Sequence, residues 1–291
     1  MPENQPEISV IVPVYNDWHL LPELLDCLSS QDIDHTKFEI IVVDNGSQEI
    51  DTSISQSANI RFFKCAQKGS YAARNVGIQN SQGKLLAFTD SDCRPSQKWL
   101  AKGYELYKLD KTSLIAGDIK VEPQNWSQLT SAEIHDVALG LPQKRYSTYG
   151  YAATANLFVP RSLFAEYGLF DGNRFSGGDA EFCRRVTSTG REIKFCQEAL
   201  VVHPARRSYF ELAKKRRRIK GAQFSAGTPK QQRLWIIRTI IPPLLAYKLI
   251  VTSRSITTAQ KLRATLIETR LWFVGVVELI QIRALKKQAV R

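Results

Sequence analysis

The sequence predicts an α/β fold built around a mostly parallel, doubly wound sheet. Three apolar runs, over residues 8–14, 38–43 and 85–88, have the length and the Val, Ile and Leu content of strands buried on both faces. Two segments between them, residues 18–30 and 70–80, carry apolar side chains at the spacing of amphipathic helices. Strands that alternate with helices along a chain favour a parallel sheet covered by helices.

The N-terminal part of the chain supplies the core of this sheet. The strand over residues 8–14 leads through a polar turn into the helix over residues 18–30. The strand over residues 38–43 ends in the polar loop Asp44–Ser47, and residues 60–63 are a further short strand candidate. Because ligands bind beyond the carboxyl ends of the strands in such sheets, we expect these loops to lie in the functional site.

The middle of the chain has a less regular pattern. We expect a strand over residues 118–122, a helix or loop over 126–139 and a strand over 150–159, which Pro160 closes. The remaining expected elements are a helix over residues 161–167 that Gly168 ends, a helix that begins near Asp179, and two short strands over residues 192–195 and 199–202.

Asp179 follows the pair Gly177-Gly178, which permits a tight turn. It falls in the first turn of the next predicted helix, where exposed backbone N–H groups favour a carboxylate. Helix capping is therefore a sufficient explanation of Asp179 on this pattern alone.

The most informative stretch is Asp90-Ser91-Asp92, which follows the apolar run Leu85–Phe88. Side chains at i and i+2 of an extended segment point the same way, so both carboxylates face one site. Carboxylate oxygens suit Mg²⁺ or Mn²⁺, which usually complete their coordination with water and substrate phosphates. A nucleotide diphosphate is the natural ligand of such a site, and a solvated acidic turn is the alternative.

The composition is that of a globular protein with a substantial core. Of 291 residues, 43% are hydrophobic and 23% are charged, which allows one large domain or a domain plus an appendage. The five cysteines show no C-x-x-C or zinc-ligand spacing, so neither a disulfide framework nor a structural zinc is expected. Residues 1–7 lack the basic and apolar segments of a signal peptide, so we expect a cytoplasmic protein with reduced thiols.

The positive charge is concentrated in the C-terminal region. Residues 203–291 contain 20 Lys and Arg against three Asp and Glu, a net charge of +17, whereas the whole chain carries +12 and residues 1–202 therefore −5. We predict an acidic catalytic domain over residues 1–204 and a basic, helical region over residues 205–291. A polyanionic surface, either nucleic acid or an anionic membrane, is the expected partner of the basic region.

Two apolar runs in this region, residues 234–251 and 271–280, are interrupted by charge or proline or are too short to span a membrane. Trp and Tyr within them and Lys and Arg beside them fit helices that lie in the interface of an anionic membrane. This predicts peripheral attachment to the inner face of the cell membrane. Packing on the catalytic domain, or an oligomer contact, explains the same runs equally well.

Five segments, in order along the chain, resemble the motifs of the family 2 glycosyltransferases of GT-A fold. Each motif is short, but their joint presence over about residues 7–210 makes the resemblance specific. It implies a nucleotide-sugar donor, a divalent metal and inversion at the anomeric carbon. The segments are Val10–Asn16, Val42–Ser47, Ala73–Gly77, Phe88–Asp92 and Gly177–Phe182.

Matched by position, the resemblance implies a nucleotide site built from the first three of these segments. Asp44 is implied as the acceptor of a hydrogen bond from a uracil ring, with Pro13 and Tyr15 lining the base pocket. Arg74 is implied as a further contact to the nucleotide.

The resemblance also implies a metal site. Asp92 matches the direct ligand of Mn²⁺ or Mg²⁺, and Asp90 matches the residue that faces ribose or a metal-bound water. His203 follows a strand at a place where some relatives have a metal or phosphate contact, and a structural role is the alternative.

Asp179 matches the catalytic base of the family. The common family form is Gly-Glu-Asp, whereas this chain has Gly177-Gly178-Asp179, so a second carboxylate beside the base is missing. Thr154 and Asn156 are candidates for contacts to the sugar acceptor, and core or strand-pairing roles explain them equally well.

Together these observations predict an inverting glycosyltransferase that moves a sugar from a nucleotide donor, most simply a UDP-sugar, to a hydroxyl of a glycan or lipid-linked acceptor. The displacement requires a general base, and a metal neutralises the leaving diphosphate. Three alternatives stay open. The first is a sugar-nucleotide pyrophosphorylase, which would carry a Gly-rich, basic signature that Pro13–Asn16 lacks. The second is a protein that binds nucleic acid through Lys214–Lys220, which leaves the carboxylates unexplained. The third is a catalytically silent protein that keeps only the scaffold.

Overall fold

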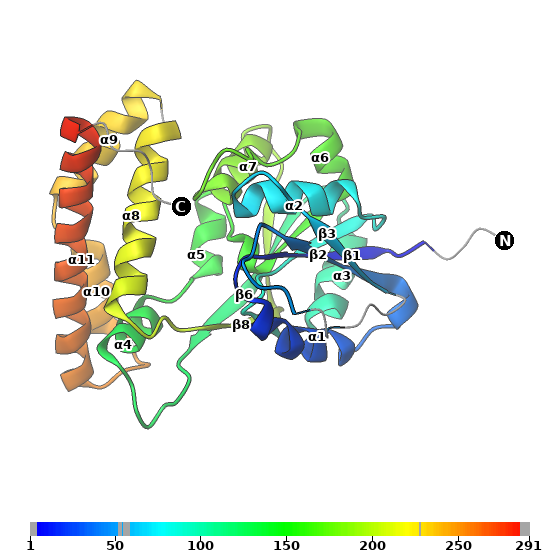
Figure 1. The fold of residues 1–291 in the computed structure, drawn as a ribbon, viewed down its shortest axis with the longest axis horizontal. Coiled ribbons are helices and arrows are strands. Elements are labelled where there is room, and N and C mark those ends of the chain that lie inside the picture. Colours follow the sequence, from blue (N-terminus) through cyan, green and yellow to red (C-terminus); the bar gives the residue numbers. More distant parts are fainter. Residues whose placement is uncertain (1–4, 52–53, 55–58, 227, 286–291) are drawn as a thin grey trace. The chain divides into compact units, whose positions relative to one another are not determined.

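The computed structural model describes residues 5–51, 54, 59–226 and 228–285. The chain forms two compact units, which we call the sheet unit and the helical unit (Figure 1). The sheet unit comprises Met1–Lys120, Leu141–Asn173 and Gly178–His203, and the helical unit comprises Val121–Gly140, Arg174–Gly177 and Pro204–Arg291. The helical unit thus includes a segment from the middle of the chain, and the domain boundary expected after residue 204 stays a prediction.

The sheet unit is built on an eight-stranded sheet in the order β3-β2-β1-β4-β7-β6-β8-β5. Strands β3, β2, β1 and β4 are parallel, whereas β7 is antiparallel to both β4 and β6, and β5 is antiparallel to β8. The predicted α/β fold class is confirmed, with a mixed sheet. The strands are β1 (Ile8–Val14), β2 (Phe38–Asp44), β3 (Ile60–Lys64), β4 (Leu85–Phe88), β5 (Arg94–Pro95), β6 (Leu114–Glu122), β7 (Leu157–Pro160) and β8 (Ile193–Pro204).

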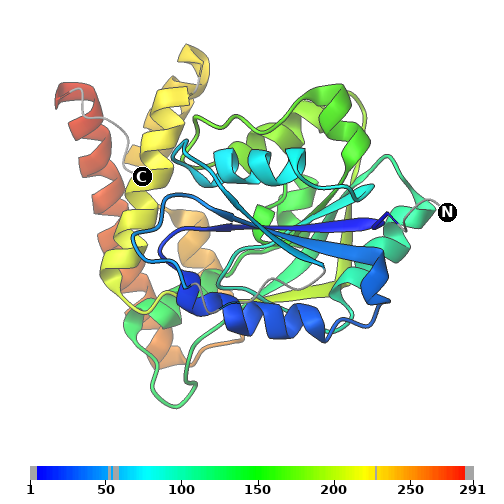
Figure 2. The same cartoon turned by 45° about the vertical axis from the view of Figure 1, so that its right-hand side comes forward.

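Helices cover both faces of the sheet, as the views in Figures 1 and 2 show. Buried side chains of α1 and α3 belong to the cluster on one face, and those of α2, α6 and α7 to the cluster on the other. The helices and turns of the sheet unit are η1 (Trp18–Leu20), α1 (Leu21–Ser29), η2 (His35–Lys37), α2 (Ser70–Gln79), α3 (Trp99–Leu109), α5 (Gln143–Thr148), η3 (Thr154–Asn156), α6 (Arg161–Tyr167) and α7 (Gly178–Thr187).

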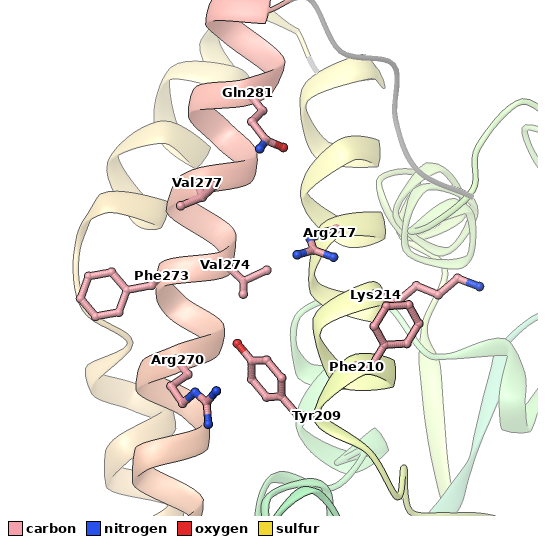
Figure 3. A pocket seen from close by; sticks show the side chains of 9 residues that line it. All are labelled: Tyr209, Phe210, Lys214, Arg217, Arg270, Phe273, Val274, Val277 and Gln281. Carbon is pink, nitrogen blue, oxygen red and sulfur yellow. The ribbon is translucent and has the colours of Figure 1, made fainter.

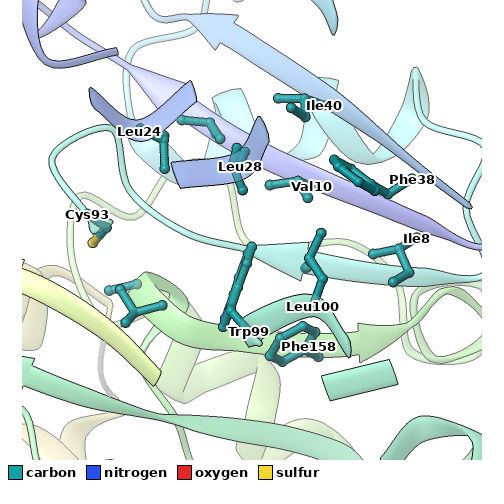
Figure 4. Close-up of a cluster of buried hydrophobic side chains, with 14 of the residues drawn as sticks. Ile8, Val10, Leu24, Leu28, Phe38, Ile40, Cys93, Trp99, Leu100 and Phe158 are labelled. Carbon is teal, nitrogen blue, oxygen red and sulfur yellow. The ribbon is translucent and has the colours of Figure 1, made fainter. Parts of the chain in front are cut away.

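The alternation of side chains along the strands explains why two cores form. In β1, Val10 faces the cluster that contains Leu24 and Leu28 of α1 (Figure 4). The neighbouring Ile11 faces the opposite cluster with α2. Trp99 of α3 extends the first cluster and is fully buried. Each such side chain contributes about 1.5–3 kcal/mol on burial, and this packing fixes the strand ends that carry the polar loops.

The helical unit packs α4 against the C-terminal helices. The side chain of Thr130 caps α4, and Glu133 completes a capping box, so this helix begins at a defined residue. Small and aliphatic side chains of α4 then pack against α8, α10 and α11. The helices of this unit are α4 (Ser131–Leu139), α8 (Tyr209–Ala226), α9 (Pro229–Ile240), α10 (Leu244–Thr252) and α11 (Thr258–Leu285).

A buried ionic network joins three of these helices. Glu268 of α11 is 1% exposed, and its carboxylate contacts His135 of α4 at 2.8 Å. The same carboxylate accepts two hydrogen bonds from Arg216 of α8, at 2.9 and 2.8 Å. Burial by itself raises the pKa of Glu268, but His135 and Arg216 outweigh it, so the pKa lies below its ordinary value.

Three local predictions about secondary structure were wrong. The strand expected over residues 150–159 is confined to Leu157–Pro160, because Thr154–Asn156 form a 3₁₀ turn. The two short strands expected over residues 192–195 and 199–202 are one strand, β8. The helix expected from residue 18 begins with the 3₁₀ turn Trp18–Leu20 and becomes α-helical only at Leu21.

Among the described residues, no single helix is long and apolar enough to cross a membrane. The pair α9 and α10, bent by 54° at the break between them, meets the criteria of length and composition when taken together.

Candidate active site

One edge of the sheet gathers the predicted site residues. Strands β2, β1 and β4 are adjacent and parallel, so the loops after Asp44, Val14 and Phe88 leave the sheet at the same edge. Strand β7 is antiparallel to β4 with Leu157 opposite Phe88, which brings the preceding 3₁₀ turn to this edge as well. The ends of β2 and β4 lie two strand spacings apart, about 10 Å.

Asp44 is buried at the end of β2 and held by several donors. Trp18 Nε1 donates to its Oδ1 at 2.9 Å, Gly46 N donates to Oδ2 at 3.0 Å, and Ser47 N lies 3.3 Å from both oxygens. Burial alone raises the pKa of Asp44, but the hydrogen bonds from Ser47, Trp18 and Gly46 together lower it below its ordinary value. Asp44 is therefore a fixed carboxylate.

The loop after β1 is tied to the loop after β2. Asn16 has a positive φ of 59°, its N–H donates to Ser47 Oγ at 2.8 Å, and its Oδ1 accepts from Gln48 N at 2.9 Å. Tyr15 beside it is 41% exposed, and the partly buried Pro13 lies opposite Val43 of β2. Pro13 and Tyr15 therefore lie close to Asp44, as expected for residues of one pocket.

Arg74 of α2 forms an ion pair with Asp90. The Arg74 side chain is 4% exposed, and its Nε is buried without a hydrogen-bond partner in the part of the chain that the structure describes. A buried guanidinium with an unused donor beside a carboxylate is a ready partner for an anionic ligand.

The D-x-D segment forms a cluster with Cys93 and His203. One potential ligand atom from each of Asp90, Asp92, Cys93 and His203 lies within 4.8 Å of the others. His203 is buried, and its Nε2 lies 3.9 Å from Asp92 Oδ2. The two carboxylates and the imidazole fit a divalent cation, and oxygen ligands favour Mg²⁺ or Mn²⁺.

Asp179 lies in the first turn of α7, as predicted. Its Oδ1 accepts from Ala180 N at 2.8 Å, and its Oδ2 lies 3.4 Å from the N–H of Thr154. The ring of the buried Tyr71 lies beside Gly178, the residue before Asp179. Burial first, and then the charge of Asp179, raise the pKa of Tyr71. Asp179 is only partly buried, so one side of the carboxylate stays accessible.

Thr154 and Asn156 differ from what an acceptor contact requires. Asn156 is fully buried. Its Oδ1 accepts a hydrogen bond from Trp99 Nε1 at 2.8 Å, and its Nδ2 donates to the carbonyls of Asp118 and Ala199 at 2.7 and 2.8 Å. The structure therefore favours the core role for Asn156. Thr154 is 4% exposed and meets Asp179 through its backbone N–H.

Sequence reasoning missed Trp18 and Tyr71 as site residues. Trp18 was assigned to a helix and Tyr71 to the apolar face of another, and both do pack in the core. Their polar atoms nevertheless reach Asp44 and Asp179. The one available signal was the i, i+3 spacing of Tyr71 and Arg74, which places both side chains on one face of α2.

A mixed α/β sheet with carboxylates gathered at one edge is the architecture of the GT-A class of fold, and comparisons with known proteins identify the family. The chain belongs to glycosyl transferase family 2, whose model matches residues 9–168, and it is a glycosyltransferase. It is 35% identical over 230 residues to glycosyltransferase AglE of Haloferax volcanii, covering 77% of this chain and 75% of that protein. It is 27% identical over 209 residues to the pre-mycofactocin glycosyltransferase of Mycobacterium tuberculosis, covering 69% of this chain and 43% of that protein.

Solved structures share the fold at low sequence identity. A mannosyltransferase from Pyrobaculum calidifontis, in complex with GDP-Man and Mn²⁺, matches with a TM-score of 0.61 at 16% identity over 98% of this chain and 88% of that one. S. aureus TarS 1–349, in complex with UDP-GlcNAc, matches with a TM-score of 0.56 at 18% identity over 98% and 93%. These likenesses support the fold.

The helical unit has a second feature of interest, a groove of about 720 Å³ between α8 and α11 (Figure 3). Its lining combines apolar side chains with three cations and, among the described residues that line it, no carboxylate. Arg270 lies 4.6 Å from the ring centre of Tyr209 in this groove. The lining residues are Tyr209, Phe210, Lys214, Arg217, Arg270, Phe273, Val274, Val277 and Gln281.

Proposed function

We propose that this glycosyltransferase is inverting and metal-dependent, and that it transfers a sugar from a UDP-sugar to a hydroxyl of a glycan or lipid-linked acceptor. The observation that carries the proposal is the convergence of Asp44, Asp92 and Asp179 at one edge of the sheet, each held by partners of its own.

The donor fits across the end of β1. A base held at Asp44 and a diphosphate at Asp92 would be separated by about two strand spacings, or about 10 Å, which suits a nucleoside diphosphate. Asp44 presents a fixed carboxylate to a ring N–H, and Pro13 and Tyr15 supply the pocket wall. The unused Nε of Arg74 supplies a cationic donor to the phosphates or ribose.

The residues of the D-x-D cluster would hold the metal, with Asp92 as the direct ligand, Asp90 beside it and His203 as a third donor. When bound, Mn²⁺ or Mg²⁺ would act as a Lewis acid that neutralises the negative charge of the departing diphosphate. Arg74 holds Asp90 through its ion pair and so fixes one wall of this cluster.

Asp179 would act as the general base. The acceptor hydroxyl gives its proton to the Asp179 carboxylate, its oxygen forms the new bond to the anomeric carbon, and the bond from that carbon to the diphosphate oxygen breaks with its electron pair. Attack from the face opposite the leaving group inverts the configuration. The partly exposed position of Asp179 in α7 supports this role.

The first test compares UDP binding with transfer. Isothermal titration should show UDP binding that Mn²⁺ strengthens, and a UDP-sugar should be hydrolysed or transferred only with a divalent metal. Asp179→Asn should lower transfer at least about 1000-fold because it removes the proton acceptor, while leaving the affinity for UDP unchanged. Glu181→Gln, two residues further along α7, is the matched control and should keep its activity. Loss of UDP binding in Asp179→Asn, or full activity, contradicts the assignment.

We further propose that the helical unit docks on an anionic membrane and that the enzyme works there, in the cytoplasm. Large apolar side chains of α9, of α10 and of the break between them are 45–67% exposed, namely Leu234, Ile237, Ile240, Ile241, Leu244, Leu245 and Val251. Exposed cations lie beside them, including Arg233, Arg238 and Lys248. The groove between α8 and α11 combines the same two chemistries, which suits the headgroup and first carbons of an anionic lipid.

A further inference from the structure

Helix α2 lies beside two carboxylates of the candidate site, Asp90 and Asp179. Arg74 pairs with Asp90 on one side, and Tyr71, one helical turn earlier, lies next to Asp179 on the other. The guanidinium of Arg74 lies 5.4 Å from the ring centre of Tyr71, so the two side chains also contact each other. Tyr71 is 5% exposed and packs against Phe170, with 5.7 Å between the ring centres.

The ring of Tyr71 occupies the space beside Gly178, the residue that precedes Asp179. A Cβ atom at Gly178 would lie 2.7 Å from Cδ2 and 2.8 Å from Cε2 of Tyr71, closer than real Cβ contacts. Gly178 does not have a positive φ, so its backbone conformation would accept another residue. The close approach of Tyr71 is therefore what requires glycine at this position.

This packing gives a physical reason for the departure from the Gly-Glu-Asp pattern. A glutamate at position 178 has no room while Tyr71 is present. The polar neighbour of Asp179 on this side is the Tyr71 phenol, which is a hydrogen-bond donor, in place of a second carboxylate.

We propose that Tyr71 is the positioning residue of Asp179, and that its ring and the side-chain-free Gly178 form one matched unit that holds the carboxylate for the acceptor. This inference rests on the proposed role of Asp179 as general base. A carboxylate offers about four lone-pair positions. The N–H groups of Ala180 and Thr154 use two of them. The Tyr71 side chain lies beside Gly178, next to this carboxylate, and the remaining positions can serve the acceptor hydroxyl.

The phenol also keeps its proton through the reaction. Burial and the charge of Asp179 raise the pKa of Tyr71, so the group remains a donor at neutral pH. Tyr71 thus orients the base and takes no part in the proton transfer itself.

Tyr71→Phe tests this role because it removes the hydroxyl and keeps the ring against Gly178. We expect kcat to fall about tenfold or more, as for loss of a hydrogen bond to a charged group, with KM for both substrates and the affinity for UDP unchanged. Tyr107→Phe is the matched control, since Tyr107 is a helical tyrosine 7% exposed in the cluster on the opposite face of the sheet. Unchanged kcat in Tyr71→Phe, or an equal loss in Tyr107→Phe, overturns the proposal.

A second measurement does not depend on activity. Thermal unfolding of Tyr71→Phe, Asp179→Asn and the double variant should give non-additive changes in Tm, because the two groups lie next to each other. Gly178→Ala should lower Tm in the wild-type background and cost much less in Tyr71→Ala, where the ring is missing. Additive changes in both cycles overturn the proposal. If the cycles show coupling but the wild-type enzyme transfers no sugar, the proposed function fails and the contact stands.

Discussion

The carboxylates of the candidate site differ in what holds them. N–H donors fix Asp44, an arginine holds Asp90, and two backbone N–H groups hold Asp179. The contacts of Asp92 are weaker, with His203 at 3.9 Å and the thiol of Cys93 at 3.7 Å. Because Asp92 has the weakest contacts within the protein, we expect a cation to bind this carboxylate directly.

Asp92→Asn should therefore weaken metal activation more than Asp90→Asn does. We expect EDTA to abolish transfer by the wild-type enzyme, and added Mn²⁺ or Mg²⁺ to restore it. Asp92→Asn should need at least about tenfold more metal for half-maximal activity, since it replaces a charged ligand with a neutral one. Activity that survives EDTA, or an equal metal requirement in Asp92→Asn and the wild type, argues against this site. Titration of initial rates with metal gives the result.

Trp18 offers a test of the nucleotide pocket. Trp18→Phe removes the indole N–H that donates to Asp44 and keeps an aromatic ring next to Phe62, which now lies 5.8 Å away between ring centres. Loss of one hydrogen bond to a charged group costs about 1.5–3 kcal/mol, so the affinity for UDP should fall at least about tenfold. Trp126→Phe, at a 52% exposed position, should leave UDP affinity unchanged. Calorimetric titration distinguishes the two, and equal affinities in both variants would refute the link between Trp18 and the pocket.

At the residue scale, the sequence was enough to find the carboxylates and too little to find their partners. The D-x-D segment and the loop at Asp44 stand out because strand ends and acidic residues are local patterns. Trp18 is 26 positions from Asp44 and Tyr71 is far from Asp179, and nothing in the local sequence links them. Asn156 shows the opposite error: its polar side chain suggests a contact to a ligand, whereas it is fully buried in the structure.

At the scale of elements, close helix–sheet packing decides stability. Gly103 in α3 faces Phe158 of β7, and a Cβ atom there would lie 2.4 Å from the phenyl Cε1. Gly103→Ala should therefore destabilise the protein by about 1–3 kcal/mol, as overpacking of a core does. A Cβ atom at Gly275 in α11 would lie 3.5 Å from its nearest neighbour, Lys220 Cε, which is an ordinary contact distance.

Gly275→Ala is thus a matched variant, and we expect it to increase the stability of the protein. A helical alanine is about 0.5–1 kcal/mol more favourable than glycine, and this site has room for the methyl group. Denaturant unfolding of both variants should show a lower midpoint for Gly103→Ala and a higher one for Gly275→Ala. A rise in both would show that the contact with Phe158 relaxes without cost.

The elements themselves were predictable where one local pattern dominated. Strands β1, β2 and β4 are continuous apolar runs, and α2 has a regular apolar face, so these agree with expectation. The strand β8 was divided in two because its middle, Gln197–Glu198, is polar and exposed. The strand β7 was extended too far because buried Thr154, Ala155 and Asn156 look like strand residues while forming a turn.

At the scale of the whole molecule, the uneven distribution of charge is the dominant property. The C-terminal 89 residues carry the excess of 20 basic over three acidic side chains. Two of these acids, Glu268 and Glu278, are 1% exposed, and Glu211 accepts hydrogen bonds from Arg207 N and Ser208 N at the start of α8. The exposed charges of this C-terminal region are therefore predominantly basic, and each cation near an anionic bilayer contributes about 1 kcal/mol.

This charge and the exposed apolar helices together predict salt-dependent membrane binding. The full-length protein should sediment with vesicles that contain phosphatidylglycerol and much less with pure phosphatidylcholine, and binding should weaken as salt shortens the Debye length from about 30 Å to about 8 Å. Leu244→Asp should abolish binding, because Leu244 is 67% exposed on α10 and would carry a charge into the bilayer. Leu109→Asp is the matched control, at an 82% exposed leucine in the sheet unit, and should bind as the wild type does. A protein that stays in the supernatant at low salt, or two variants that lose binding equally, would rule out docking through α9 and α10.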